Sequence, residues 1–118
     1  MKQKILFLDD DLIRHDAFRQ RTKDMNVEVT YIETVEQAIK ALTNFKFDIA
    51  SLDHDLGGQV YVKETEGTGY EVALFIEEKL EEDKLPNEVI VHSYNPAGAE
   101  RMVYAIKKRI AKCVRQPF

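Results

Sequence analysis

Short apolar runs alternate along the chain with segments of helical periodicity. Apolar runs that are continuous, with no regular polar alternation, are typical of strands buried on both faces of a parallel sheet. Four runs have this character and predict strands over residues 5–8, 27–32, 47–52 and 89–91. We expect residues 113–118 to supply one further, short edge strand.

Amphipathic segments separate these runs. Ile13 and Ala17 mark the first segment, and the second spans residues 35–45 with Thr34 as its expected N-cap. The third runs from about residue 70 to 82, and the fourth begins near Pro96 and continues to 110. Alternation of strand and helix predicts an α/β fold with a parallel sheet and right-handed crossovers. We expect residues 1–118 to form a single domain.

Length and composition narrow the class of protein. A chain of 118 residues suits one compact domain, and no apolar run approaches the length of a membrane-spanning helix. The N-terminus has an apolar run of only four residues before an acid, so we expect no signal peptide. The single cysteine, Cys113, excludes an internal disulfide and fits a reducing cytoplasm.

Charge is distributed unevenly along the chain. The 17 basic and 21 acidic residues give a net charge of −4. No acid follows residue 100, whereas six cations do: Arg101, Lys107, Lys108, Arg109, Lys112 and Arg115. A solvated helix face is the ordinary explanation of such a run, and attraction of a phosphate or nucleic acid is the functional one.

The connection over residues 57–69 is long for a strand-to-helix turn. Glycines bracket an apolar centre that contains Tyr61. A mobile flap over a site and a surface hairpin both fit this pattern.

Acidic residues follow two of the predicted strands. Asp9 and Asp10 end the first strand, Asp11 is an expected helix N-cap, and Asp53 ends the third. Ligands of open α/β sheets bind at the carboxyl ends of the strands, so these carboxylates are expected to converge there. Converging carboxylates need a compensating cation, and hard oxygen ligands suit Mg²⁺, Mn²⁺ or Ca²⁺.

Two of the three histidines fall at the same strand ends. His54 follows Asp53, and His92 precedes Ser93 at the end of the fourth strand. Imidazole titrates near neutrality and serves as a general acid or base, so the pair is a candidate for phosphoester chemistry. Adjacent side chains of a regular strand point to opposite faces. If Asp53 and Ser93 face the cleft, both histidines face away from it.

These strand ends resemble those of a response-regulator receiver domain. That family has an acidic pair that binds Mg²⁺, a phosphoacceptor Asp, a switch Ser or Thr, and a Lys-Pro-Phe after the fifth strand. The matching positions hold Asp9 with Asp10, Asp53, and Ser93. The chain closes with Arg-Gln-Pro-Phe, so Gln116 takes the place of the lysine, and no room is left for a final helix.

A narrower resemblance covers nearly the whole chain. Leu-Asp-His-Asp-Leu-Gly at 52–57 and His-Ser-Tyr-Asn-Pro-Ala-Gly at 92–98 are similar to the cyclic-phosphate-processing receiver-like domains of phage and bacterial genomes. The resemblance implies the three-layer, flavodoxin-like receiver fold with a parallel sheet of four strands and a short fifth. The implied strand order is 2-1-3-4-5, with the final helix missing.

The same resemblance implies roles for the candidate residues. A divalent metal, Mg²⁺ or Mn²⁺, is expected at the carboxylates Asp9, Asp10, Asp53 and Asp55. His54 and His92 are the expected acid/base pair, acting with Asp53. Expected contacts to the substrate come from Ser93, Asn95, Arg14 and Tyr61.

The function implied is a metal-assisted phosphoesterase. Its expected substrates are 2′,3′-cyclic phosphate RNA ends or cyclic nucleotides, with no membrane partner. Two alternatives stay open. One is a receiver phosphorylated at Asp53, and the other is a protein that binds a cyclic nucleotide without turnover.

Overall fold

Five parallel strands form one sheet in the computed structural model of the protein, which describes residues 2–56 and 67–118. The strands are β1 (Gln3–Leu8), β2 (Val27–Ile32), β3 (Ile49–Leu52), β4 (Glu88–Val91) and β5 (Cys113–Arg115). They lie in the order β2-β1-β3-β4-β5. The predicted α/β fold, its strand order and the short fifth strand are thereby confirmed.

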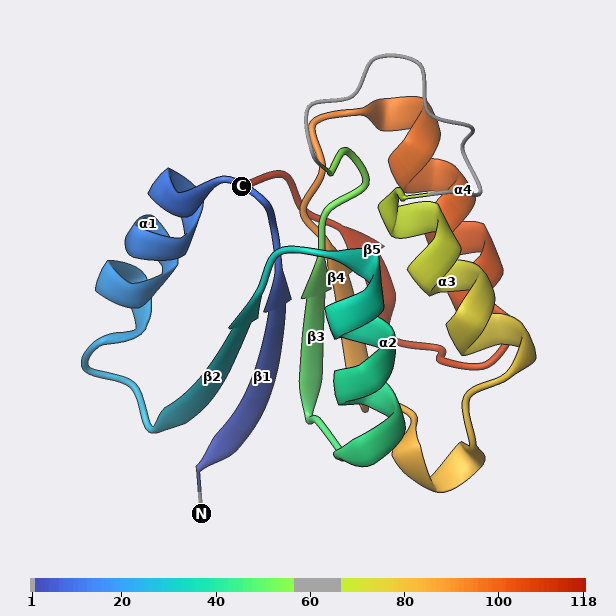
Figure 1. Ribbon diagram of the computed structural model, residues 1–118, viewed down its shortest axis with the longest axis horizontal. Helices are drawn as coiled ribbons and strands as arrows, with labels where there is room; N and C mark the ends of the chain where they lie inside the picture. Colours follow the sequence, from blue (N-terminus) through green and yellow to red (C-terminus); the bar gives the residue numbers. More distant parts are fainter. Residues whose placement is uncertain (1, 57–66) are drawn as a thin grey trace.

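Helices cover the two faces of the sheet unequally. Helix α1 (Leu12–Thr22) covers one face, and α2 (Val35–Asn44), α3 (Gly69–Glu78) and α4 (Pro96–Lys107) pack on the other (Figure 1). No helix follows β5 in the described part of the chain. None of the helices over residues 2–56 and 67–118 is both long and apolar enough to cross a membrane.

The third helix is shorter than its apolar periodicity predicts. It ends at Glu78, and a separate 3₁₀ turn follows at Glu82–Lys84. The reason lies in the backbone: the N–H groups of both Lys79 and Leu80 bond to the carbonyl of Phe75, which closes the last turn. The fourth helix likewise ends at Lys107, before the predicted position.

Side chains at the helix N-termini explain where three helices begin. Thr34 forms a capping box with Gln37, and Asp11 accepts a hydrogen bond from the backbone of Ile13. Asn95 does the same for Gly98, with Pro96 in the first turn. Each cap follows a strand directly or within a few residues. Polar side chains therefore gather at the carboxyl edge of the sheet.

The main core lies between the sheet and helices α2–α4. Alternate strand residues supply it, including Leu6, Leu8, Ala50, Leu52 and Val89. Strand β2 was predicted to be buried on both faces, and this is wrong. Glu28 and Thr30 are exposed, because β2 is an edge strand with a neighbour on one side only.

The start of α3 is pressed against the end of β3. The Gly69 N–H donates to the carbonyl of His54 at 2.8 Å. A Cβ atom at Gly69 would overlap the backbone carbonyl of Asp53. Only glycine therefore allows α3 to approach the segment that carries Asp53.

Replacing Gly69 by alanine tests this approach. We expect Gly69→Ala to lower the free energy of unfolding by roughly 2 kcal/mol or more, because the strand end cannot shift without moving buried groups. Chemical denaturation measures the change. Glu78→Ala in the same helix is the control and should alter stability by less than about 0.5 kcal/mol. Equal stability of the two variants would contradict the close packing.

Candidate functional site

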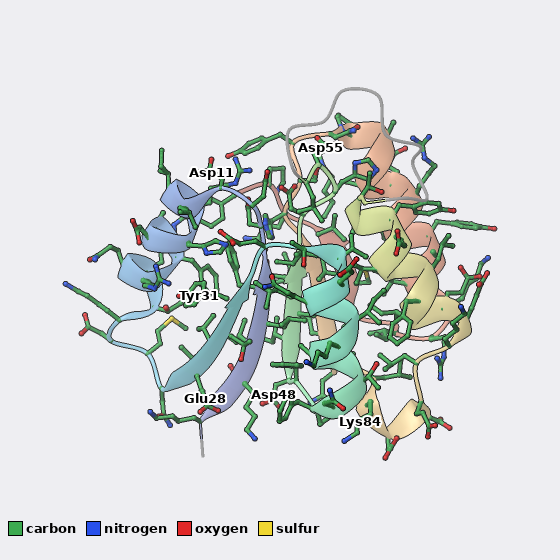
Figure 2. All side chains as sticks on the ribbon, viewed as in Figure 1. Asp11, Glu28, Tyr31, Asp48, Asp55 and Lys84 are labelled. Atoms are coloured by element: carbon green, nitrogen blue, oxygen red, sulfur yellow. The ribbon has the colours of Figure 1, made fainter. Side chains whose placement is uncertain are left out.

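The register of the sheet aligns three side chains just beyond the strand ends. Leu8 pairs with Leu52, and Leu52 pairs with Val91. The next residues along the three strands are Asp9, Asp53 and His92, which therefore lie in a row and share one face. Asp11 and Asp55 mark this edge of the molecule in Figure 2, whereas Glu28, Asp48 and Lys84 lie at the opposite end.

These three aligned residues form a buried cluster. One ligand atom from each of Asp9, Asp53 and His92 lies within 4.8 Å of the others. All three residues are buried, and Asp9 has no exposed surface. The two carboxylates fit a hard divalent cation such as Mg²⁺ or Mn²⁺. The donor set thus suits the ions expected from the sequence.

Arg14 ties the cluster to α1. Its Nε donates to Asp9 Oδ2 at 2.6 Å, and its Nη2 donates to Asp9 Oδ1 at 3.0 Å. The same Nη2 lies 3.5 Å from Asp53 Oδ2, and Nη1 lies 3.5 Å from Asp11 Oδ2. One guanidinium therefore contacts three carboxylates. The hydrogen bond to Asp9, together with the negative charge of all three, raises the pKa of Arg14 above its ordinary value.

The two buried carboxyl groups differ in proton affinity. Burial favours the protonated form of Asp9, but hydrogen bonds from His92 and Arg14 outweigh it and lower the pKa of Asp9 to about 2. Burial and the nearby charge of Asp9 raise the pKa of Asp53 to about 7, although Arg14 acts in the other direction. Asp9 is thus a permanent anion, whereas Asp53 changes charge near neutrality.

His92 lies between Asp9 and the sheet face under α1. Its Nε2–H donates to Asp9 Oδ2 at 3.0 Å, and its Nδ1 lies 2.7 Å from the hydroxyl of Ser51. The ring stacks on Phe7 with a centroid separation of 4.8 Å and an interplanar angle of 3°. Hydrogen bonds at both nitrogens and the stacked ring hold this imidazole in one orientation.

Sequence reasoning missed Ser51. The available signal was a hydroxyl in the middle of an otherwise apolar, buried strand. The third histidine, His15 on α1, also contacts the cluster, because its Nε2–H donates to the backbone carbonyl of Asp9 at 2.6 Å. Both residues support the side chains predicted from the strand ends.

His54 points away from the row. Its Nδ1–H donates to Asp55 Oδ1 at 2.8 Å, and its ring packs against the backbone of Gly98 at the start of α4. Asn95 Nδ2 lies 3.3 Å from the same oxygen of Asp55. Of the two histidines, His92 lines up with Asp53 and His54 does not. Strand alternation predicted this orientation for His54. The same prediction for His92 is wrong, because the register places His92, and not Ser93, level with Asp53.

The other predicted residues lie around the row. Asp10 lines a neighbouring cavity of about 530 Å³, together with Val35, Glu36 and Leu56. Ser93 is buried, and its hydroxyl accepts a hydrogen bond from the backbone of Asn95 at 3.0 Å. The connection over residues 57–69 was open to two interpretations, a flap and a surface hairpin. Residues 57–66 of it, including Tyr61, lie outside the described residues.

Several cations of the C-terminal run have partners within the fold. Lys108 pairs with Glu77 at 2.9 Å, and Arg109 donates to the carbonyls of Ile76 and Leu80 at the end of α3. Arg115 donates to the carbonyl of Ser93 at 3.3 Å. These contacts fasten α3, α4 and β5 to one another.

Solved structures share this fold at low sequence identity. A response regulator from Burkholderia pseudomallei, with a phosphorylated aspartic acid, calcium ion and citrate, has a TM-score of 0.68 and 17% identity. The match covers 99% of this chain and 61% of that protein, so the chain spans less than two thirds of its length.

Two further structures cover more of their own length. The receiver domain of a sensor histidine kinase from Pseudomonas aeruginosa PAO1, with a magnesium ion coordinated in its active-site cleft, has a TM-score of 0.70 and 17% identity over 100% of this chain and 88% of that one. The non-phosphorylated HemR receiver domain from Leptospira biflexa has a TM-score of 0.70 and 23% identity, over 99% and 84%. The fold is therefore that of response-regulator receiver domains.

The family model of the cyclic-phosphate processing receiver domain matches residues 4–108. The chain belongs to this family. No curated protein matches the sequence.

The raised pKa of Asp53 predicts a pH-dependent stability. Its pKa of about 7 lies above the ordinary 3.8. The stabilising contribution of protonated Asp53 is therefore complete below about pH 4 and is lost as the pH rises through 7. With a chelator present to remove metal ions, the free energy of unfolding of Asp53→Asn should be higher than that of the wild type by up to ~4 kcal/mol at pH 8. At pH 5 the difference should be much smaller.

Chemical denaturation at the two pH values measures this difference. Asp16→Asn is the control, because Asp16 is exposed and forms its ion pair with Arg19, one turn further along α1. A pH-independent gain for Asp53→Asn would show that the charge of Asp53 is not the cause.

Proposed function

We propose that Asp53 accepts a phosphoryl group with the help of a divalent cation. The observation that carries this proposal is a buried carboxylate at the end of β3, beside the second carboxylate of Asp9 and the cation of Arg14. Membership of a receiver family supports it, as do similar structures with a phosphorylated aspartic acid or a magnesium ion in the cleft.

The two oxygens of Asp53 have different surroundings. Oδ1 accepts a hydrogen bond from the backbone of His54 at 2.9 Å, which orients the carboxylate. Oδ2 is 3.5 Å from Arg14 and is the oxygen that attacks phosphorus. The bond from phosphorus to the donor oxygen breaks, and the donor leaves with that electron pair. Attack requires the ionised form of Asp53, so phosphorylation should slow as the pH falls below 7.

A divalent cation held by Asp9 and Asp53 would neutralise the negative charge that repels an incoming phosphate. We place Asp10 at the rim of this cation site, where carboxylate oxygens or bound water complete the shell. Ser93 and Asn95 are the nearby polar groups proposed to contact phosphoryl oxygens. Gln116 carries no charge, so Arg14 is the cation from this chain that we assign to the phosphoryl group.

Phosphorylation with a small acyl phosphate tests the proposal. In Mg²⁺ we expect the intact protein to gain the mass of one phosphoryl group, labile to hydroxylamine as an acyl phosphate is. Asp53→Asn should gain none, and a chelator should reduce the wild-type yield at least ~10-fold. Asp48→Asn, at the opposite edge of the sheet, is the matched control. Equal labelling of Asp53→Asn would refute the assignment.

A second candidate, cyclic-phosphate opening, is favoured by His92. Its imidazole lies in the acidic row, and the family model that matches the chain carries the description cyclic-phosphate processing. In this reaction water attacks the phosphorus of a 2′,3′-cyclic phosphate and one ring P–O bond breaks. The released sugar oxygen takes a proton from an imidazolium. His54, on the other side of Asp53, is the second proton-transfer group of this candidate.

The two candidates separate in one pair of assays. If the protein opens cyclic phosphates, 2′,3′-cyclic nucleotides or RNA ending in a cyclic phosphate give a ring-opened monophosphate in Mg²⁺ or Mn²⁺. We expect His92→Gln to reduce that rate at least ~100-fold, while Asp53 carries no lasting phosphoryl group. Binding without product would indicate a protein that sequesters the nucleotide. No binding and no product, with labelling of Asp53, would leave the phosphoacceptor function alone.

A further inference from the structure

We propose that Arg14 is a built-in cation that must leave Asp9 when a divalent cation binds. The guanidinium and the metal compete for the same carboxylate, so Arg14 sets the metal affinity of the site. This inference rests on the cation-binding part of the proposed function and is independent of phosphoryl transfer.

The hydrogen bonds of Asp9 are the first step of the argument. A carboxylate offers about four acceptor positions. Oδ1 accepts from the backbone N–H of Asp11 at 2.9 Å and from Arg14 Nη2 at 3.0 Å. Oδ2 accepts from Arg14 Nε at 2.6 Å and from His92 Nε2 at 3.0 Å. All four positions are therefore filled, and a metal ion can bind Asp9 only where one donor withdraws.

Arg14 is the donor that can withdraw. The N–H of Asp11 cannot withdraw, because it belongs to the backbone at the start of α1. The buried His92 ring is held in place by its stacking on Phe7 and its hydrogen bond to Ser51. The side chain of Arg14 is 27% exposed and stands on a long, flexible stem at the edge of the cluster. Rotation of its stem releases two acceptor positions and moves the cation toward solvent without disturbing the core.

Electrostatics gives the exchange its direction. The positive charge of Arg14 already compensates Asp9, Asp11 and Asp53. A divalent cation among these carboxylates would be repelled by Arg14 at close range, so the two cations exclude each other. Once displaced, the guanidinium regains the N–H donors that the carboxylates had engaged. The phosphate contact expected of Arg14 from the sequence thus becomes available after metal binding.

Mn²⁺ titration followed by electron paramagnetic resonance of the free ion tests the competition. We expect Arg14→Ala to bind Mn²⁺ roughly tenfold tighter than the wild type, or more, because a competing positive charge is gone. Arg14→Lys should fall between the two, since an ammonium cannot make the bidentate contact. Arg19→Ala, on the same helix and paired with Asp16, is the control and should match the wild type.

Thermal unfolding supplies a second measurement. Without metal, Arg14→Ala should melt below the wild type, because the charges of Asp9 and Asp53 lose their partner. Saturating Mn²⁺ should raise the melting temperature of Arg14→Ala more than that of the wild type. If Arg14→Ala folds only with Mn²⁺, the competition is supported in its strongest form. Equal or weaker Mn²⁺ binding by Arg14→Ala and Arg14→Lys would overturn it.

A double variant separates this inference from the proposed function. Arg14→Ala combined with Asp9→Asn should lose the tight Mn²⁺ binding, which locates the ion at Asp9. If it keeps that binding, the ion lies elsewhere and the inference fails. Tighter Mn²⁺ binding by Arg14→Ala without labelling of Asp53 would retain the competition and reject the phosphoacceptor function. Labelling of wild-type Asp53, together with an unchanged Mn²⁺ affinity of Arg14→Ala, would retain the phosphoacceptor function and reject the competition.

Discussion

The buried carboxylate of Asp9 is the constraint on which the rest of the site depends. It is fully buried at the end of the interior strand β1, and a charge in that position is tolerable only with strong partners. The partners come from three directions: the backbone at the start of α1, Arg14 on α1, and His92 beyond β4. The His15 bond to the carbonyl of Asp9 adds a further tie to α1. Asp9 thereby fixes the only helix on its face of the described fold.

Because Arg14 makes its close contacts with Asp9, the negative charge of the nearby Asp53 is only weakly compensated. Arg14 donates its two short hydrogen bonds to Asp9, whereas its Nη2 lies 3.5 Å from Asp53 Oδ2. Two adjacent carboxyl groups therefore have pKa values of about 2 and about 7. The first is a structural anion, and the second is a group whose charged form gains from any further cation or covalent neutralisation. The reactivity proposed for Asp53 therefore depends on the hydrogen bonds that keep Asp9 ionised.

How far the sequence predicted this arrangement depends on the kind of feature. Strand positions and the convergence of Asp9 and Asp53 at one edge of the sheet follow from apolar runs and the carboxyl-edge rule, which concern the backbone alone. The strand order was implied by the resemblance to receiver-like domains. Side-chain direction beyond a strand end was harder: His92 and His54 occupy similar places, yet register aligns only His92 with Asp53. The hydroxyl of Ser51 stands out in an apolar strand, but its partner His92 is 41 residues away and no local pattern identifies it. Arg14 was expected to contact the substrate, and its pairing with Asp9 and Asp53 depends on how α1 packs against the sheet.

Charge explains why a phosphate-handling site at this edge needs a cation. Asp9, Asp11 and Asp53 share one guanidinium, and Asp55 adds another carboxylate beyond His54. Two basic residues near the end of the chain, Lys108 and Arg109, do not correct this, because they bind Glu77 and the carbonyl of Ile76 on α3. A phosphoryl group approaching the metal-free edge would meet excess negative charge. In the function proposed above, a divalent ion reverses that charge and releases Arg14, so that metal binding and phosphate attraction form one electrostatic event at the end of β1.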